Sequence, residues 1–295
     1  MLARARHSLS GCKRRVRIMM QNAPVLRSVI KASLRGEEAR ASLARDIPIS
    51  PAIAVAKAFG QLHDGIVIPD YELLLAKGYR RFLRPGQVVF DVGSHAGVHL
   101  AQFVDVVGSA GRVIAFEPIP ALANALVTKF RDRSNVEIRN LALGEKPGRS
   151  EFLILHQALG MSGFRQRADS GDQGAEKITV EIDTIDHQAA DLSRLDYVKV
   201  DIEGAEISCL RGAVKTVNRF RPLISVEYGM PTYSLFGNTA MTLFEWARQH
   251  RYVPSDLFGN LILQPEEWLI VCDYSLWDFF LVPEERRQEW TSLFS

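Results

Sequence analysis

Four acidic residues each end a short apolar run of the chain that reads as a strand: Asp91, Glu117, Asp201 and Glu227. In open α/β sheets, ligands bind at the carboxyl ends of the strands. A purely structural sheet edge would more often carry neutral residues at these points. We therefore expect the four carboxylates to meet at one edge of a sheet and to form a ligand-binding or catalytic site there.

The first of these strands leads into a turn with the pattern Asp-x-Gly-x-x-x-Gly, residues 91–97. Gly93 can adopt a positive φ, and a helix starting near His95 would point its N–H groups at a ligand. Dinucleotide-binding enzymes use Gly-x-Gly-x-x-Gly, which would require glycine in place of His95. Asp91 would also repel a pyrophosphate, whereas it suits a ligand with an ammonium group. The turn therefore favours S-adenosylmethionine over NAD.

Glu117 lies 26 residues after Asp91, at the end of the second predicted strand, and is followed by Pro118. A carboxylate at this position can accept hydrogen bonds from both hydroxyls of a nucleoside ribose. Ala142 follows the third predicted strand, where the adenine edge would lie and where a small side chain leaves room. We expect these three residues to contribute to the cofactor site.

A second acidic group, Asp201, Glu203 and Glu227, would lie beside the methyl group of such a cofactor. These residues are candidates for a general base, and the pattern does not select one of them. Asp201 and Glu227 can alternatively supply two of the oxygen ligands of a Mg²⁺ ion. Glu206 begins the next predicted helix, where we favour a helix-capping role.

Acceptor specificity is expected from a polar, glycine-rich loop over 157–177 and from Tyr228, Met230 and Tyr233, because long irregular loops in compact domains are often functional. His95 and His99 are four residues apart, a spacing that can hold a metal, but no third ligand is suggested nearby. We expect His99 either to pack in the core or to contact and support a residue that binds the ligand.

Strands and helices alternate after residue 87, which predicts a mostly parallel sheet covered by helices on both faces. A helix over 70–83, with Asp70 as its N-cap, precedes this part, and the prolines around residue 48 break a helix-prone lead. The predicted strands are 88–90, 112–116, 136–143, 178–182, 196–201 and 223–227, with short ones around 253 and 280; the predicted helices are 95–107, 118–131, 204–219 and 239–250.

Several of these segments resemble the FkbM family of S-adenosylmethionine-dependent methyltransferases. They are VVFDVGSHAGVHL, GRVIAFEPIPALANAL, NVEIRNLALGE and KVDIEGAEISCLRGA followed by RPLISVE, and the resemblance covers about residues 87–285. The resemblance implies a class I methyltransferase fold, Rossmann-like, with a mostly parallel seven-stranded sheet and helices on both faces. It also implies O-methylation of a hydroxyl on a sugar, glycoconjugate or natural product.

The resemblance assigns cofactor binding to Asp91, Gly93, Gly97 and Glu117. This chain departs from the family by having Ser94-His95 in place of the Ala-Asn pair that is usual in the first turn, and we expect Ser94 and His95 to be part of the cofactor site as well. Two alternatives stay open: an NAD(P)-dependent oxidoreductase, which the glycine spacing disfavours, and a non-catalytic cofactor-binding protein with the same fold.

The composition is that of an ordinary globular protein. Of 295 residues, 47% are hydrophobic and 24% are charged, which excludes a wholly disordered or collagen-like chain. The mean hydropathy is −0.02, and no apolar run reaches the roughly 18 residues that span a bilayer, so a polytopic membrane protein is excluded. Three scattered cysteines indicate free thiols in a reducing compartment, and we expect a cytoplasmic location.

The charge is unevenly distributed. Residues 1–36 carry nine Lys and Arg and no acid, whereas the rest of the chain has 27 basic and 34 acidic side chains. We therefore divide the chain into a basic extension, 1–60, and a methyltransferase domain, 61–295. Such an arm is a solvated tail, a peripheral contact with anionic membrane, or an organelle-targeting segment. No specific nucleic-acid partner is expected; the expected partner is a small-molecule or glycan acceptor.

Overall fold

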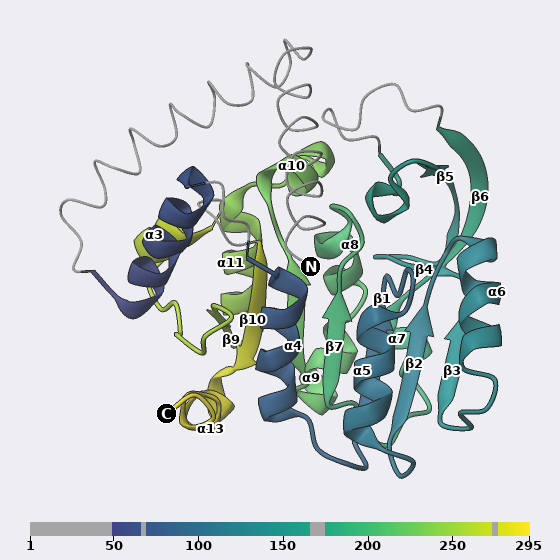
Figure 1. The fold of residues 1–295 in the computed structure, drawn as a ribbon, viewed down its shortest axis with the longest axis horizontal. Coiled ribbons are helices and arrows are strands. Elements are labelled where there is room, and N and C mark those ends of the chain that lie inside the picture. The colour runs from purple at the N-terminus through teal and green to yellow at the C-terminus, as the bar shows by residue number, and fades with distance from the viewer. Residues whose placement is uncertain (1–48, 66–68, 166–174, 273–276) are drawn as a thin grey trace, which may run out of the picture.

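A computed structural model describes residues 49–65, 69–165, 175–272 and 277–295, so the basic arm lies outside the described residues. The helices surround a seven-stranded sheet, and a three-stranded sheet lies at one side of it (Figure 1). The helices are α3 (Pro51–Asp64), α4 (Tyr71–Phe82), α5 (Val98–Val107), α6 (Pro120–Lys129), α7 (Ile185–Gln188), α8 (Glu206–Arg211), α9 (Val214–Phe220), α10 (Met230–Tyr233), α11 (Ala240–Gln249), α12 (Pro265–Val271) and α13 (Arg287–Ser292).

The large sheet has the strand order β3-β2-β1-β7-β8-β10-β9. The pairs among the first five strands are parallel, and β10 runs antiparallel to both β8 and β9. The predicted mostly parallel seven-stranded sheet is therefore confirmed. Its strands are β1 (Val88–Val92), β2 (Arg112–Phe116), β3 (Val136–Arg139), β7 (Tyr197–Val200), β8 (Leu223–Glu227), β9 (Tyr252–Ser255) and β10 (Asp278–Pro283).

Neighbouring residues of the central strands belong to two different cores, one on each face of the sheet. Val89 and Tyr197 pack with α4 and α5 on one face, whereas Phe90 and Val198 pack with α8, α9, α11 and α12 on the other. Successive side chains of a strand point to opposite faces, and both faces are covered here. This is why the sequence shows continuous apolar runs rather than an alternating pattern.

The prolines near residue 48 begin a helix instead of only ending one. Pro51 is the first residue of α3, and Ser50 caps the helix by accepting from the N–H of Ile53 at 3.2 Å. Ala52 and Ile53 are buried against the core and α3 packs on α12. The expected boundary at residue 60 therefore falls inside a packed helix.

The predicted strand over 136–143 is two strands in two different sheets. β3 ends at Arg139, and β4 (Ala142–Leu143) pairs with β6 (Glu176–Asp183), which in turn pairs with β5 (Gly148–Ile154). Asn140 lies at the change of direction, where its side chain donates to the carbonyl oxygens of Glu117 at 2.8 Å and Pro118 at 3.0 Å. The small sheet formed by β4, β6 and β5 lies beside the end of β2.

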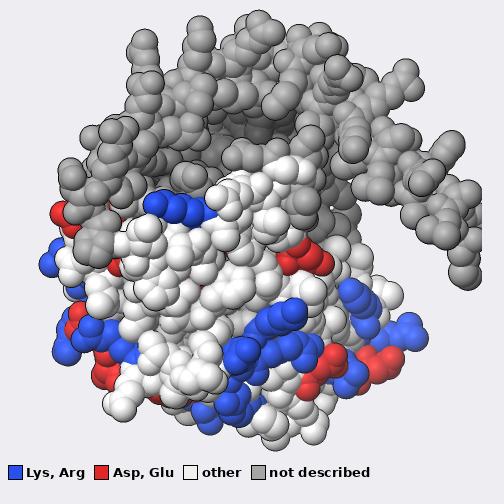
Figure 2. Space-filling model, turned by 60° about the vertical axis from the view of Figure 1, so that its left-hand side comes forward, with Lys and Arg blue, Asp and Glu red and all other residues white. Residues whose placement is uncertain are grey.

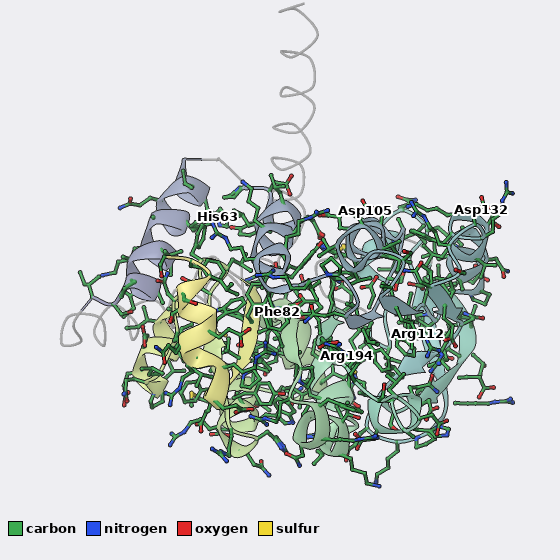
Figure 3. All side chains as sticks on the ribbon, turned by 90° about the horizontal axis from the view of Figure 1, so that it is seen from below. His63, Phe82, Asp105, Arg112, Asp132 and Arg194 are labelled. Carbon is green, nitrogen blue, oxygen red and sulfur yellow. The ribbon has the colours of Figure 1, made fainter. Side chains whose placement is uncertain are left out.

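Charged pairs mark the edge of the large sheet where the strands begin. Seen from below in Figure 3, Arg112 and Arg194 lie at this edge, and they pair with Glu137 and Asp196, each at 2.6 Å.

Figure 2 shows another face, on which basic side chains gather on the lower half with acidic ones beside them. No helix within the described ranges has the length and apolar character needed to cross a membrane.

Candidate active site

A cavity of about 400 Å³ lies where β1, β2, β7 and β8 end. Its walls contain nearly all the residues predicted for the site: Asp91, Gly93, Ser94, His95, Glu117, Pro118, Ala142, Asp201, Glu203 and Glu227. Gly97 is not among the lining residues. It precedes α5 at a φ of 71°, and a side chain there would meet Leu126 of α6. Gly97 therefore allows α5 and α6 to pack closely.

The turn before α5 extends further along the chain than predicted, since α5 begins at Val98 and not near residue 95. His95 has a φ of 46°, in the left-handed region that asparagine tolerates better than most residues. Gly93 has a φ of 83°, and a Cβ there would lie 1.9 Å from the carbonyl oxygen of Asp201. Only glycine fits at position 93, because β1 and β7 meet there through their main chains.

Glu117 connects the end of β2 to this turn. Its side chain is 3% exposed; Oε2 accepts from the N–H of His95 at 2.8 Å, and Oε1 accepts from the N–H of Ile119 at 2.9 Å. Burial raises the pKa of Glu117, and these two hydrogen bonds oppose the rise. Each carboxylate oxygen has a further lone pair, so the group can still accept from two ligand hydroxyls.

Asp91 is 1% exposed, and neither of its carboxyl oxygens has a hydrogen-bond partner among the described residues. Burial raises its pKa, while the positive charge of Lys199 and the neighbouring His99 oppose that rise. A buried carboxyl group without a partner is costly, so this position suits a bound cation.

The three residues of the second acidic group lie close together. Asp201, Glu203 and Glu227 each place a carboxylate oxygen so that the three lie within 4.8 Å of one another. Burial alone would raise the pKa of Asp201, but the ammonium of Lys199, 2.9 Å away, outweighs burial and lowers it. Burial raises the pKa of Glu227 well above its ordinary value, and the charges of Asp201 and Glu203 add to this. Of this pair, Glu227 therefore favours the protonated form and Asp201 the ionised form.

Lys199 was not predicted as a site residue, although a signal exists in the sequence. It lies two residues before Asp201 on β7, so the two side chains share a face of the sheet. Its side chain is 4% exposed, and the nearby acids raise its pKa although burial would lower it. Glu72 of α4 also lines the cavity and was missed, because nothing near it in the sequence indicates a site.

The roof over the cavity is apolar. Phe152 of β5 and Phe164 line it with their rings 5.2 Å apart, and Leu159 and Ile119 lie on the same wall. This wall adjoins Ala142. Part of the predicted specificity loop, residues 159–164, thus lies on the Glu117 side of the cavity, and 166–174 lie outside the described residues.

Other residues considered from the sequence lie away from the cavity. Tyr228 and Tyr233 stack on each other at 4.5 Å in the core, and neither they nor Met230 line the cavity. Glu206 does not cap α8 with its side chain; its Oε1 accepts from the N–H groups of Ile202 at 3.1 Å and Gly204 at 2.9 Å, so it stabilises the turn that precedes the helix.

Comparison with solved structures finds methyltransferases at low sequence identity. Methyltransferase FkbM from Methylobacillus flagellatus is 15% identical with a TM-score of 0.46, over 84% of this chain and 59% of that one. An S-adenosylmethionine-dependent methyltransferase from Aquifex aeolicus is 12% identical with a TM-score of 0.39, over 77% and 96%. Aeropyrum pernix fibrillarin with bound S-adenosylmethionine is 13% identical with a TM-score of 0.38, over 68% and 67%. A search of curated proteins gave no match.

The strand order, with an antiparallel strand next to one edge, and the acid-lined cavity at the strand ends agree with the class I methyltransferase fold that the sequence predicts. Residues 91–254, more than half of the chain, match the model of the methyltransferase FkbM domain. The chain belongs to the FkbM methyltransferase family.

Proposed function

We propose that this enzyme transfers a methyl group from S-adenosylmethionine to a hydroxyl of a sugar, glycoconjugate or natural product. The observation that carries the proposal is the presence of two distinct acidic groups in one cavity. Glu117 and Asp91 border the glycine turn, and Asp201 with Glu203 and Glu227 form the second group. The first suits a nucleoside with an ammonium group, and the second suits an acceptor that must lose a proton.

The cofactor half of the cavity fits S-adenosylmethionine. Glu117 would take the ribose hydroxyls, Asp91 lacks a partner among the described residues and would face a cation, and Ala142 with the apolar roof would face the adenine. When bound, S-adenosylmethionine supplies an activated methyl group on a sulfonium. The protein has to hold the acceptor oxygen in line behind that methyl group, and positioning of this kind can contribute several kcal/mol.

The acceptor half provides for the proton. An alcohol loses its proton during or after attack, and a positioned base accelerates such steps by about 10²–10⁴-fold. We assign this role to Asp201, because its carboxylate contacts the ammonium of Lys199 at 2.9 Å, which lowers its pKa, whereas the pKa of the neighbouring Glu227 is raised. Glu203 lies beside both groups and helps to orient the acceptor.

Magnesium is the alternative source of positive charge at this point. Carboxylate oxygens are the ligands that Mg²⁺ prefers, and Asp201, Glu203 and Glu227 supply three of them. Lys199 already contacts Asp201 at 2.9 Å, and we assign the positive charge there to its ammonium. An assay with a chelator tests this assignment directly.

The test has a binding arm and a turnover arm. Calorimetry should show that S-adenosylhomocysteine binds and that NAD and NADP do not bind comparably; the reverse preference would refute the methyltransferase assignment. Turnover is then followed by incubating the protein with labelled S-adenosylmethionine and fractions of cell extract. The labelled product should be a methyl ether, and a product methylated on nitrogen or carbon would contradict the proposed hydroxyl acceptor.

Asp201→Asn is the matching variant. It should still bind S-adenosylhomocysteine but lose about 10²–10⁴-fold in turnover. Asp105→Asn is the control, because Asp105 is exposed on α5 outside the cavity lining (Figure 3). Equal turnover of the two variants would exclude Asp201 as the base.

We also propose a cytoplasmic location, with the basic arm of residues 1–36 making a peripheral contact with anionic membrane. The all-positive charge of the arm and its position before the methyltransferase domain support this proposal.

A further inference from the structure

A second cavity, of about 430 Å³, adjoins the candidate active site. Phe164 and Leu143 line both cavities, so the two share part of a wall. The methyl donor and the acidic residues are assigned to the first cavity, and the second has no role in the chemistry described above. The residues that line the second cavity include Leu143, Lys146, Phe164, Arg165, Ser208 and Phe236.

The second cavity borders the acidic group through Glu203. Gly163 lies directly before Phe164, and a Cβ at Gly163 would be 3.4 Å from the Cβ of Glu203. Gly204 follows Glu203, and a Cβ there would be 2.7 Å from the ring of Phe236. An acceptor whose hydroxyl lies among the acidic residues can therefore extend past Glu203 into the second cavity.

Arg165 places a fixed positive charge at this cavity. Its Nη1 donates to the carbonyl oxygen of Leu235, and its guanidinium carbon lies 5.0 Å from the centre of the Phe236 ring. A guanidinium has five N–H donors, and the contact with Leu235 uses one of them. Arg165 makes no ion pair with an acid among the described residues. Its remaining donors are therefore available to a ligand.

Lys146 supplies a second positive charge. The N–H of the preceding Glu145 donates to Oγ of Ser208 at 3.1 Å, which ties the segment that carries Lys146 to α8. The carboxylate of Glu145 lies 3.9 Å from Arg211, which is outside the cavity lining. Within the described ranges Lys146 has no acidic partner. The Lys146 and Arg165 side chains are both exposed, so a ligand entering from solution can reach them.

These groups have the chemistry of a phosphate site. Arginine binds phosphate through two parallel N–H donors, and lysine binds it as a point charge. A phosphomonoester carries a charge of about −1.5 to −2 at pH 7, which balances two cations, whereas a carboxylate balances only one. The hydroxyl of Ser208 is a further donor in the same lining.

We propose that the second cavity binds a phosphate group of the acceptor through Arg165 and Lys146, so that the acceptor is the phosphomonoester of a sugar or of another alcohol. The proposal rests on the proposed transfer of a methyl group to a hydroxyl. The phosphate would lie away from the reacting oxygen, so Arg165 and Lys146 determine which acceptor binds and take no part in the transfer itself.

A titration of inorganic phosphate tests the cavity directly. The full-length protein is saturated with S-adenosylhomocysteine, and phosphate binding is followed by calorimetry. Wild-type protein should show saturable binding, and Arg165→Gln and Lys146→Gln should each weaken it by about 10-fold, which is about 1.4 kcal/mol. Arg131→Gln and Lys215→Gln are the controls, since both residues are exposed and outside both cavity linings, and they should leave the affinity unchanged.

Turnover tests whether the phosphate belongs to the acceptor. Extract fractions that become labelled from S-adenosylmethionine should lose their acceptor after treatment with alkaline phosphatase and removal of that enzyme. On the labelled acceptor, Arg165→Gln should raise KM by about 10-fold and leave kcat within about two-fold of wild type. Arg165→Lys should restore part of the loss, because it keeps the charge without the paired donors. A purely structural role of Arg165 would instead weaken S-adenosylhomocysteine binding or lower kcat.

The outcomes separate this inference from the proposed function. If no fraction yields a labelled methyl ether, the proposed function is wrong, and the titration still decides whether the second cavity binds phosphate. If a methyl ether forms equally well after phosphatase treatment, the acceptor is not a phosphomonoester, while the proposed function stands. Phosphate binding that is absent from the wild-type protein, or equal in all five proteins, would also refute the inference.

Discussion

Glu117→Ala should weaken binding of S-adenosylhomocysteine by about 30-fold to 1000-fold. Glu117 is 3% exposed, and each of its oxygens accepts one backbone N–H, with one lone pair left for a ribose hydroxyl. Hydrogen bonds to a charged group contribute about 1.5–3 kcal/mol each. Two such bonds, reduced by the cost of ordering the ligand, amount to roughly 2–4 kcal/mol, at 1.4 kcal/mol per tenfold in affinity.

The loss has two parts that one further ligand separates. Glu117→Ala also removes the acceptor for the N–H groups of His95 and Ile119, and this loosens the turn for any ligand. An analogue of S-adenosylhomocysteine without both ribose hydroxyls reports only that second part. Calorimetry with both ligands on both proteins therefore isolates the ribose contribution. If the analogue distinguishes wild type from Glu117→Ala as strongly as the parent ligand does, Glu117 does not bind the ribose.

Three other predictions concern the main chain, a buried acid and the basic arm. In urea unfolding, Gly93→Ala should lower the free energy of unfolding by about 3 kcal/mol or more, because the added Cβ would overlap the carbonyl oxygen of Asp201. Gly86 is the control: it has a similar φ of 85°, but a Cβ there would meet no atom within 4 Å, so Gly86→Ala should lower the free energy of unfolding by only about 1 kcal/mol. Equal losses of stability in the two variants would refute the overlap at Gly93. Burial raises the pKa of Glu206 to about 8 from an ordinary 4.5, so the folded state binds this proton more tightly than the unfolded state does, and stability should fall as the pH rises between these values. Glu206→Gln should therefore reduce the fall in Tm between pH 6 and pH 8.5. An unchanged dependence of Tm on pH would show that Glu206 is not the source of the fall. Deleting residues 1–48 should leave the affinity for S-adenosylhomocysteine unchanged and abolish salt-sensitive sedimentation with anionic vesicles, and equal sedimentation of both forms would exclude a membrane role for the arm.

The residues that could be predicted from sequence are those placed by local geometry. Asp91 lies near the end of β1 and Glu117 directly follows β2, so parallel pairing brings them to the same sheet edge whatever the rest of the chain does. The same holds for Asp201, which directly follows β7, and for Glu227, the last residue of β8. An acidic residue that directly follows a buried parallel strand can therefore be assigned to the ligand-binding edge from the sequence alone.

The residues that could not be predicted are those placed by packing between distant elements. Glu72 reaches the cavity only because α4 packs on α5, and no local pattern records that contact. The segment 136–143 is divided between two sheets, with Asn140 hydrogen-bonded to the end of β2 at the division, and apolar periodicity does not reveal this. Tyr228 and Tyr233 have the composition of a binding surface, but their rings stack in the core.

The contact between Gly93 and Asp201 sets a fixed length within the enzyme. The turn that borders the cofactor site and the strand end that carries the proposed base touch through main-chain atoms, with no side chain between them to adjust. The main-chain part of the span from this turn to the proposed base is therefore fixed, and the contact of Lys199 with the Asp201 carboxylate at 2.9 Å restrains the side chain that completes it. The acceptor hydroxyl must therefore lie at one position between the methyl donor and the base. On an acceptor with many hydroxyls, the one that is methylated would be the one that projects far enough from the bound face of the acceptor to reach that position.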